Sequence, residues 1–126
     1  MIRKLDNRVQ KRGLGNVSVI RGEFHDPKLP AGKCDWLFFS SVYKEIDERV
    51  AYMRTARRAL KNKGRVAMIE YRTDAKEPGP PRKYRLPQHQ VIAEMEAAGF
   101  RWVERFDFLP REYFLVFERL DSESPP

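Results

Sequence analysis

Alternating strand-forming and helix-forming segments between residues 16 and 70 are the feature that most constrains the fold of this chain. Residues 16–21 are β-branched and alternate in polarity, which predicts a strand. Residues 36–39 form a continuous apolar run, typical of a strand that helices cover on both faces. A helical pattern then begins with Asp47 as its N-cap, and residues 65–70 form another strand-like segment. This order predicts an α/β domain with a mostly parallel sheet.

The second half of the chain predicts a helix followed by a hairpin. Pro87 suits the first position of a helix and Gly99 suits its end. Residues 101–108 and 113–120 have strand composition, and their short connection predicts an antiparallel pair. Residues 72–86 form a long proline-rich loop, of the kind that often covers a substrate site.

Composition indicates one folded domain, residues 1–126, which begins with the end of a helix at residues 3–13. Its eight Phe, five Tyr and two Trp supply large side chains for a core. Residues 121–126 are expected to be a frayed tail. The single cysteine, Cys34, excludes an intrachain disulfide and favours a reducing, cytoplasmic setting. No apolar run approaches the roughly 18 residues of a membrane helix, and the first residues do not read as a signal peptide.

Charge and histidine placement favour neither a nucleic-acid partner nor a metal. The net charge of +7 suits acidic partners, but the arginines are spread along the chain, which is typical of a solubilising surface. His25 and His89 show no ligand spacing with Cys34 or with a nearby carboxylate, so we expect no metal site.

Three short motifs resemble, in the same order, the class I S-adenosylmethionine-dependent methyltransferases of the type 11 and ubiquinone–menaquinone kind. Residues 22–36 (GEFHDPKLPAGKCDW) are similar to a family stretch in which an acidic residue precedes L-P-x-G-x-x-D. Residues 57–66 (RRALKNKGRV) resemble the RALKPGGR turn from helix to strand. Residues 94–100 (EMEAAGF) resemble the helix end LEAAGF. The resemblance covers about residues 3–120.

The resemblance implies a truncated Rossmann-like methyltransferase fold, mostly parallel, with a C-terminal antiparallel hairpin and helices on both faces. The family's sheet has the order 3-2-1-4-5-7-6. Residues 17–21 would be strand 3, residues 36–40 strand 4 and residues 66–71 strand 5, and the hairpin would supply strands 6 and 7. Strands 1 and 2, which carry the glycine-rich cofactor loop and the ribose-binding acidic residue, have no counterpart in this chain.

The resemblance also implies where ligands would bind. The residues matching the S-adenosylmethionine site are Glu23, Phe24, Ser40 and Ser41. The residues that would face a small-molecule methyl acceptor are Tyr43, Lys44, Glu45, Tyr71 and Arg72. No catalytic residue is assigned, because the sulfonium is already activated and positioning the acceptor does most of the work. Similar sequences often carry a His-His pair where this chain has Lys44-Glu45, which leaves the acceptor open.

Each candidate also has a structural interpretation. Glu23 is equally well read as a solvated loop carboxylate, and the two serines as no more than the end of a strand. The aromatic candidates Phe24, Tyr43 and Tyr71 are as readily core or rim residues. Tyr113 is placed where it could reach the acceptor, but a packing role is favoured.

The missing strands predict an exposed sheet edge between Trp36 and Ser40, because strand 4 loses the neighbour with which it pairs in the family. Such an edge invites pairing with another strand. Either residues 17–21 move in beside it, or two chains join there with two-fold symmetry. The homodimer is the favoured expectation.

Three functions are consistent with the sequence. The first is a methyltransferase-like enzyme whose cofactor site is partial, so that the activity of the isolated chain is open. The second is a non-catalytic module, derived from a methyltransferase, that oligomerises or regulates. The third is a basic nucleic-acid-binding protein, ranked last because its basic helix has few interleaved aromatic residues. That helix carries Arg54, Arg57, Arg58 and Lys61.

Overall fold

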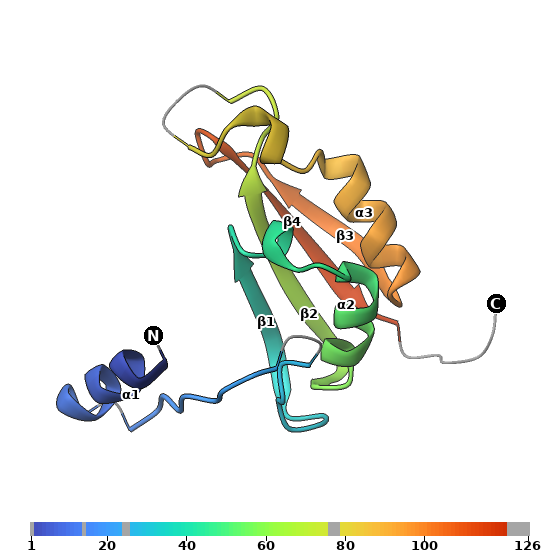
Figure 1. Ribbon diagram of the computed structural model, residues 1–126. Helices are drawn as coiled ribbons and strands as arrows, with labels where there is room; N and C mark the ends of the chain where they lie inside the picture. Colours follow the sequence, from blue (N-terminus) through green and yellow to red (C-terminus); the bar gives the residue numbers. More distant parts are fainter. Residues whose placement is uncertain (1, 14, 24–25, 76–78, 121–126) are drawn as a thin grey trace.

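The computed structural model describes residues 2–13, 15–23, 26–75 and 79–120, and consists of a four-stranded sheet with helices on one side (Figure 1). The predicted frayed tail, residues 121–126, lies outside the described residues. The α-helices are α1 (Ile2–Lys11), α2 (Arg49–Arg57) and α3 (Gln88–Ala97), and the 3₁₀ helices are η1 (Tyr43–Glu45) and η2 (Arg82–Tyr84). The strands are β1 (Cys34–Ser40), β2 (Leu60–Tyr71), β3 (Phe100–Phe106) and β4 (Glu112–Arg119).

The order of the strands is β1-β2-β4-β3, which matches the order expected for strands 4, 5, 7 and 6. β1 and β2 are parallel, with Leu37 opposite Val66 and Ser40 opposite Ile69. β4 is antiparallel to both β2 and β3. The predicted closing hairpin is therefore confirmed, and so is α3, which Gly99 terminates with a positive φ of 97°.

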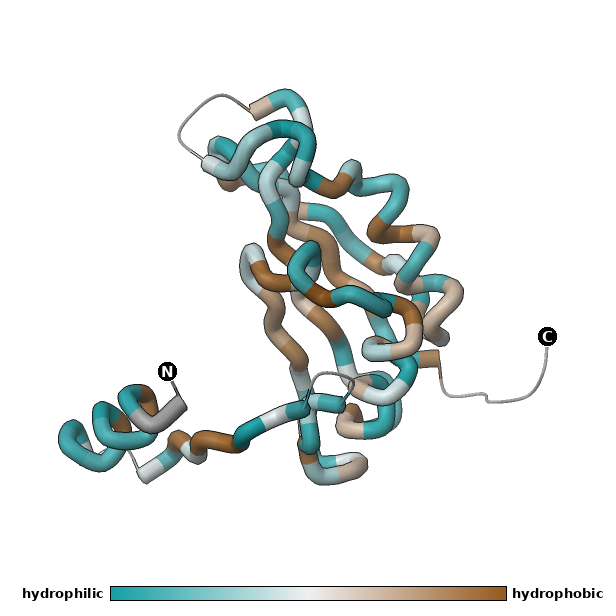
Figure 2. The backbone as a smooth tube through the Cα atoms, viewed as in Figure 1, coloured by the Kyte–Doolittle hydropathy of each residue, from teal (hydrophilic) through white to brown (hydrophobic). Residues whose placement is uncertain are grey.

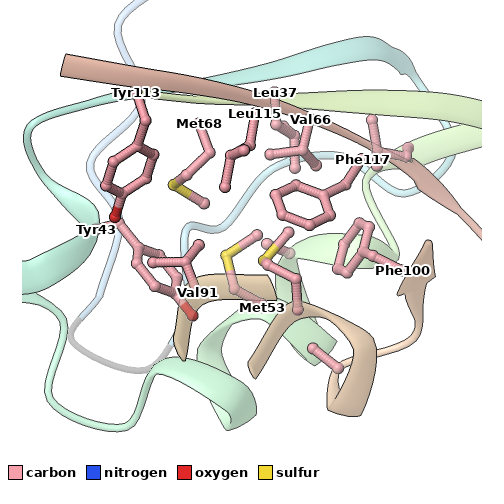
Figure 3. Close-up of a cluster of buried hydrophobic side chains, with 14 residues drawn as sticks. Leu37, Tyr43, Met53, Val66, Met68, Val91, Phe100, Tyr113, Leu115 and Phe117 are labelled. Atoms are coloured by element: carbon pink, nitrogen blue, oxygen red, sulfur yellow. The ribbon is translucent and has the colours of Figure 1, made fainter. Parts of the chain in front are cut away.

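The hydrophobic core lies between the sheet and the layer made by η1, α2 and α3 (Figure 3). Apolar residues two apart along β2 and β4 point into this layer, as strand geometry requires. They meet side chains that follow helical spacing on α2 and α3. The buried core residues include Leu37, Tyr43, Met53, Val66, Met68, Val91, Met95, Phe100, Tyr113, Leu115 and Phe117.

The opposite face of β1 is open to solvent. Trp36 and Phe38 point away from the core, and their side chains are 52% and 66% exposed. β1 is also an edge strand, as the missing neighbour predicts, so its outer backbone groups face away from the sheet. Coverage of this strand on both faces, which its continuous apolar run predicts, is not seen among the described residues. In Figure 1, α1 lies apart from the sheet.

The strand predicted at residues 17–21 does not form. Residues 17–22 belong to no helix or strand, and the nearest bridge is an isolated pair between Glu23 and Asp26. The physical reason is that a strand is stable only when its N–H and C=O groups find a ladder partner. In the family order, strand 3 pairs with strand 2, and the described residues contain no strand in that place.

The junction between α2 and β2 also differs from the prediction. The N-cap is Glu48 and not Asp47 as predicted, and the helix runs from Arg49 to Arg57. The next strand begins at Leu60, which pairs with Cys34, and not at residue 65. The register then shifts before Trp36 meets Arg65. Gly64 makes this irregular segment possible, because a Cβ atom there would lie 2.8 Å from the Lys61 carbonyl oxygen.

Candidate functional site

The carboxyl ends of β1 and β2 lie side by side and carry most of the predicted site residues. Ser40 closes β1 beside Ile69, and the amide of Ser41 continues the ladder by donating to the Ile69 carbonyl oxygen over 2.9 Å. Ser41 has a φ of 58°, a left-handed conformation that non-glycine residues rarely adopt. This conformation turns the chain sharply into η1. The strand ends therefore bring Ser40, Ser41, Tyr43, Lys44 and Tyr71 into one region.

Tyr43 anchors η1 in the core. Its side chain is buried, and its hydroxyl donates to Glu94 Oε1 of α3 over 2.7 Å. Arg49, at the start of α2, binds the same carboxylate with two hydrogen bonds of 2.8 and 2.9 Å, and Gln90 adds a fourth donor at 3.0 Å. One carboxylate thus ties η1, α2 and α3 together. In the structure, Tyr43 is thus a core aromatic residue.

The titration of this network follows from its contacts. Burial alone would raise the pKa of Glu94, but hydrogen bonds from Arg49, Gln90 and Tyr43 outweigh it and lower the pKa to about 2. Burial, together with the hydrogen bond to Glu94, raises the pKa of Tyr43. The carboxylate and the neutral phenol are therefore the forms present at neutral pH.

Glu70 is a buried acid that the sequence reading did not single out. It lies in β2, one residue before its end, opposite Tyr113, and is only 1% exposed. Its Oε2 accepts a long hydrogen bond of 3.3 Å from the amide of Lys44, while Oε1 has no hydrogen-bond partner. Burial raises the pKa of Glu70, and the amide and charge of Lys44 offset this in part. Glu70 thus contacts η1 and stabilises its first turn through the amide of Lys44.

Replacing Glu70 with glutamine is expected to raise stability at pH 8 by about 1 kcal/mol, because the amide keeps an acceptor for Lys44 without burying a charge. A raised pKa in the folded state means that Glu70 is most favourable at low pH and costs stability as pH rises. The gain should therefore vanish toward pH 4. Thermal unfolding of both proteins at the two pH values checks this. Equal stabilities of the wild type and Glu70→Gln at both pH values would contradict it.

Tyr71 and Arg72 border the same region but are held by the loop that follows β2. The Lys44 ammonium lies 5.6 Å from the centre of the Tyr71 ring, and the Arg85 guanidinium lies 5.5 Å from it. Arg72 is exposed and donates to the Pro110 carbonyl oxygen over 2.6 Å. Both residues thus lie beside the carboxyl ends of the strands, with two cations near the Tyr71 ring.

A pocket of about 510 Å³ opens beside these strand ends, on the side of the hairpin. Its wall combines two arginines with three carboxylates, and two of the pairs are ion pairs: Arg72 with Asp74 at 3.6 Å and Arg105 with Asp107 at 3.2 Å. Tyr113 also lines it, but its hydroxyl donates to the Leu86 carbonyl oxygen over 2.8 Å. The packing role favoured for Tyr113 describes this geometry.

The remaining predicted residues are placed elsewhere. Phe24 lies outside the described residues. Glu23 is exposed and its ion-pair partner is Lys28, at 3.7 Å. The segment that contains it reaches the sheet at the amino end of β1, whereas Ser40 lies at the carboxyl end of that strand (Figure 1). Glu45 is exposed at the end of η1. The structure therefore brings Ser40 and Ser41 together and leaves Glu23 apart from them.

The basic helix does not present a continuous phosphate-facing stripe. Arg57 is buried and donates to the carbonyl oxygens of Gly99 and Leu120. Arg54 donates to the Ala97 carbonyl oxygen at the end of α3, and Lys61 pairs with Asp35 at 3.2 Å. Of the four cations, three thus have identified structural partners.

Two further searches of the described residues concern metals and membranes. Among them, no group of three or more His, Cys, Asp or Glu side chains is arranged to hold a metal ion. In the same part of the chain, no helix has the length and apolar character needed to cross a membrane.

Sequence reasoning missed Arg49, Glu70, Arg85 and Glu94. Glu70 carried a usable signal, since a carboxylate that closes an apolar strand must be either exposed or specifically bound. The other three gave none, because charged residues at a helix start (Arg49), within a surface helix (Glu94) or in a loop (Arg85) are usually solvated.

Comparisons with known proteins agree with this geometry. The family described as "Methyltransferase domain" matches residues 1–107. The sequence matches no curated protein. A SAM-dependent methyltransferase from Aquifex aeolicus has a TM-score of 0.85 at 23% identity, over 90% of this chain and 61% of its own. The [4+2]-cyclase SpnF has a TM-score of 0.75 at 15% identity, over 93% and 62%. PigF with SAH has a TM-score of 0.73 at 17% identity, over 94% and 40%.

Proposed function

Because this chain belongs to the methyltransferase-domain family, we propose that it is an S-adenosylmethionine-dependent methyltransferase-like protein whose cofactor site is incomplete in a single copy. The chain spans 61% of the length of the Aquifex methyltransferase that it resembles. The observation that carries the proposal is the division of the predicted cofactor residues. Ser40 and Ser41 lie at the carboxyl end of β1, where ligands of open α/β sheets bind, while Glu23 lies apart from them.

The cofactor, when bound, would supply an activated methyl group. The residues fit it only in part: Ser40 offers an exposed hydroxyl beside the open edge of β1, but no described residue supplies the glycine-rich loop or the ribose-binding carboxylate. The chain itself contributes a segment held in place beside the site, because hydrogen bonds of Tyr43, Glu70 and Glu94 fix η1. On the acceptor side, Lys44, Glu45, Tyr71 and Arg72 would present cations, a carboxylate and one aromatic face to a small molecule.

The same fold is compatible with other activities, since fold alone does not fix chemistry. SpnF, a cyclase by name, shares it. The non-catalytic module therefore remains the second proposal, supported by the incomplete cofactor set and the unpaired edge of β1. A cytoplasmic setting is proposed on the single free cysteine.

Titration with S-adenosylmethionine and with S-adenosylhomocysteine is expected to give a Kd weaker than about 1 mM, a binding free energy smaller than about 4 kcal/mol. The reason is that no described residue supplies the glycine-rich loop or the ribose-binding carboxylate. Isothermal calorimetry at high protein concentration measures this directly.

Binding in the micromolar range would contradict an incomplete site. In that case Ser40→Trp, which fills the end of β1, should abolish binding, whereas Asn62→Trp, at an exposed position near the other end of β2, should not. No heat in any titration would favour the non-catalytic module over an active enzyme.

A further inference from the structure

Among the described residues, the first forty contain a strand-forming segment and a strand edge that each have no partner strand. The segment belongs to the N-terminal arm, which we define as residues 2–13 and 15–21. Within the arm, residues 17–20 are extended, and no backbone hydrogen bond joins residues 17–22 to another described residue. The edge is that of β1, whose exposed face carries Trp36 and Phe38. Figure 2 shows both as apolar stretches.

The arm has its own packed face. A groove between α1 and the extended segment is lined by Val9, Val17 and Val19, and Val9 is buried in it. If residues 17–21 became a strand, Val17 and Val19 would share one of its faces, because side chains alternate along a strand. The helix α1 would then lie over that face. Once paired, the arm would thus supply a strand together with the helix that covers it.

Exposed apolar side chains concentrate on the arm and the edge. Of the ten large hydrophobic side chains that are exposed in the described part of the chain, six lie in residues 5–42. Those on the arm are Leu5, Val17 and Ile20, and those at the edge are Trp36, Phe38 and Val42. Apolar surface gathered in this way marks an association site more often than scattered exposure does.

The arm does not lie along β1 within one copy. It runs away from the amino end of β1 in Figure 1, and that end is fixed by hydrogen bonds from the amides of Gly32, Lys33 and Cys34 to the carbonyl oxygens of Arg58 and Ala59. Donor strand and acceptor edge are therefore present in each copy but separated in space. Reciprocal exchange between two copies satisfies both with one two-fold axis.

We propose that this protein forms a homodimer in which residues 17–21 of each copy pair with the outer edge of β1 of the other. In an antiparallel register Val17 would meet Phe38 and Val19 would meet Trp36, which brings Ile20 close to Cys34, and α1 would cover the open face of β1. The strand supplies backbone hydrogen bonds that the edge lacks, as in other cases of strand addition. Each copy donates one arm and accepts one. Both contacts bury surface of that copy, and together they contribute to the roughly 800 Å² per partner that a stable interface buries.

Light scattering after size exclusion tests the assembly on the full chain. At tens of micromolar, we expect a mass twice the 14.9 kDa of one chain. Phe38→Lys at the acceptor edge and Val19→Pro in the donor strand should each weaken dimerisation at least tenfold. The matched control is Phe108→Lys, since Phe108 is 69% exposed, close to the 66% of Phe38, but lies outside both surfaces. Far-ultraviolet circular dichroism spectra like that of the wild type will show that the variants fold.

Cross-linking separates exchange from the alternatives. A chain with Ile20→Cys and Cys34→Ser is mixed with the wild type and treated with a short bismaleimide, which should join unlike chains only if the arm of one reaches β1 of the other. A wild-type monomer overturns the proposal. A dimer that survives Val19→Pro but not Phe38→Lys also overturns it, and indicates direct pairing of two β1 edges. An internal cross-link in an Ile20→Cys monomer indicates that the arm folds back on its own β1. None of these readouts depends on cofactor binding.

Discussion

Replacing Glu94 with alanine is expected to lower the free energy of unfolding by about 3 kcal/mol, because three donors lose their common acceptor. Tyr43 would keep a buried hydroxyl without its partner, and Arg49 would keep a charge that is only 20% exposed. Gln90 is less affected, since it can turn toward solvent. Urea unfolding of the variant and the wild type measures the difference. A loss below about 0.5 kcal/mol would show that water replaces the carboxylate.

The pH dependence of the same variant gives an independent reading. The folded-state pKa of Glu94 lies at about 2, below its ordinary 4.5, so the carboxylate stabilises the fold above pH 4.5. That stabilisation is lost as pH falls from 4.5 through 2. The alanine variant should therefore lose less stability over this window than the wild type. Glu94→Gln, which keeps an acceptor for Tyr43, is the matched control and should retain part of the stability at neutral pH. Parallel pH curves for the wild type and the alanine variant would contradict this account.

Glu94 and Glu70 also show why the pKa values of two acids in one protein can shift in opposite directions. Glu94 receives hydrogen bonds from Arg49, Gln90 and Tyr43, so the charged form is favoured despite burial. Glu70 receives one long bond from an amide and leaves Oε1 unpaired, so burial prevails. The free energy of unfolding should rise with pH as Glu94 ionises and fall with pH as Glu70 ionises. Both hold η1, which joins the end of β1 to α2.

The elements that sequence patterns predicted correctly are those whose partners are also in the chain. The hairpin of β3 and β4 and the helix that Gly99 ends follow from local composition, and each finds its packing partner nearby. Residues 17–21 have an equally clear strand pattern, yet no ladder forms there. Propensity describes how a segment behaves when a neighbour is present, and residues 17–21 have none in one copy.

The same distinction applies to the candidate site, where sequence could place some residues and not others. Ser40, Ser41 and Tyr71 could be placed from sequence, since the carboxyl ends of adjacent parallel strands meet at one edge. The charges that fix the site could not, because Glu94 and Arg49 are 45 residues apart and nothing local marks them as partners. The ring of Tyr43 lies in the core (Figure 3), and its contact with an acceptor stays a prediction. Long-range polar contacts need the tertiary structure to become visible.

The loop after β2 depends in the same way on a residue that sequence reasoning passed over. Arg85 is 6% exposed, and its guanidinium donates to the carbonyl oxygens of Pro80 at 2.7 Å, Arg72 at 3.0 Å and Ala75 at 2.6 Å. It thereby ties both ends of the loop together beside the Tyr71 ring. Gly79 is required at this contact, since a Cβ atom there would lie 3.0 Å from both Arg85 and Tyr71.

Arg85→Ala is therefore expected to cost about 3 kcal/mol, because three carbonyl oxygens, that of Ala75 in a buried hydrogen bond, lose their donor and a cavity opens beside Tyr71. Lysine at this position should recover little, since an ammonium cannot reproduce the planar fork that reaches three acceptors. Arg82→Ala is the matched control: Arg82 is exposed on η2, and its loss should change stability by less than about 0.5 kcal/mol. Hydrogen exchange at the Ala75 amide, which donates to the Arg72 carbonyl oxygen over 3.2 Å, should accelerate in Arg85→Ala while the amides of β4 keep their protection relative to global unfolding. Equal stabilities for the two alanine variants would mean that the loop holds its shape without Arg85, and that Tyr71 and Arg72 are positioned by β2 alone.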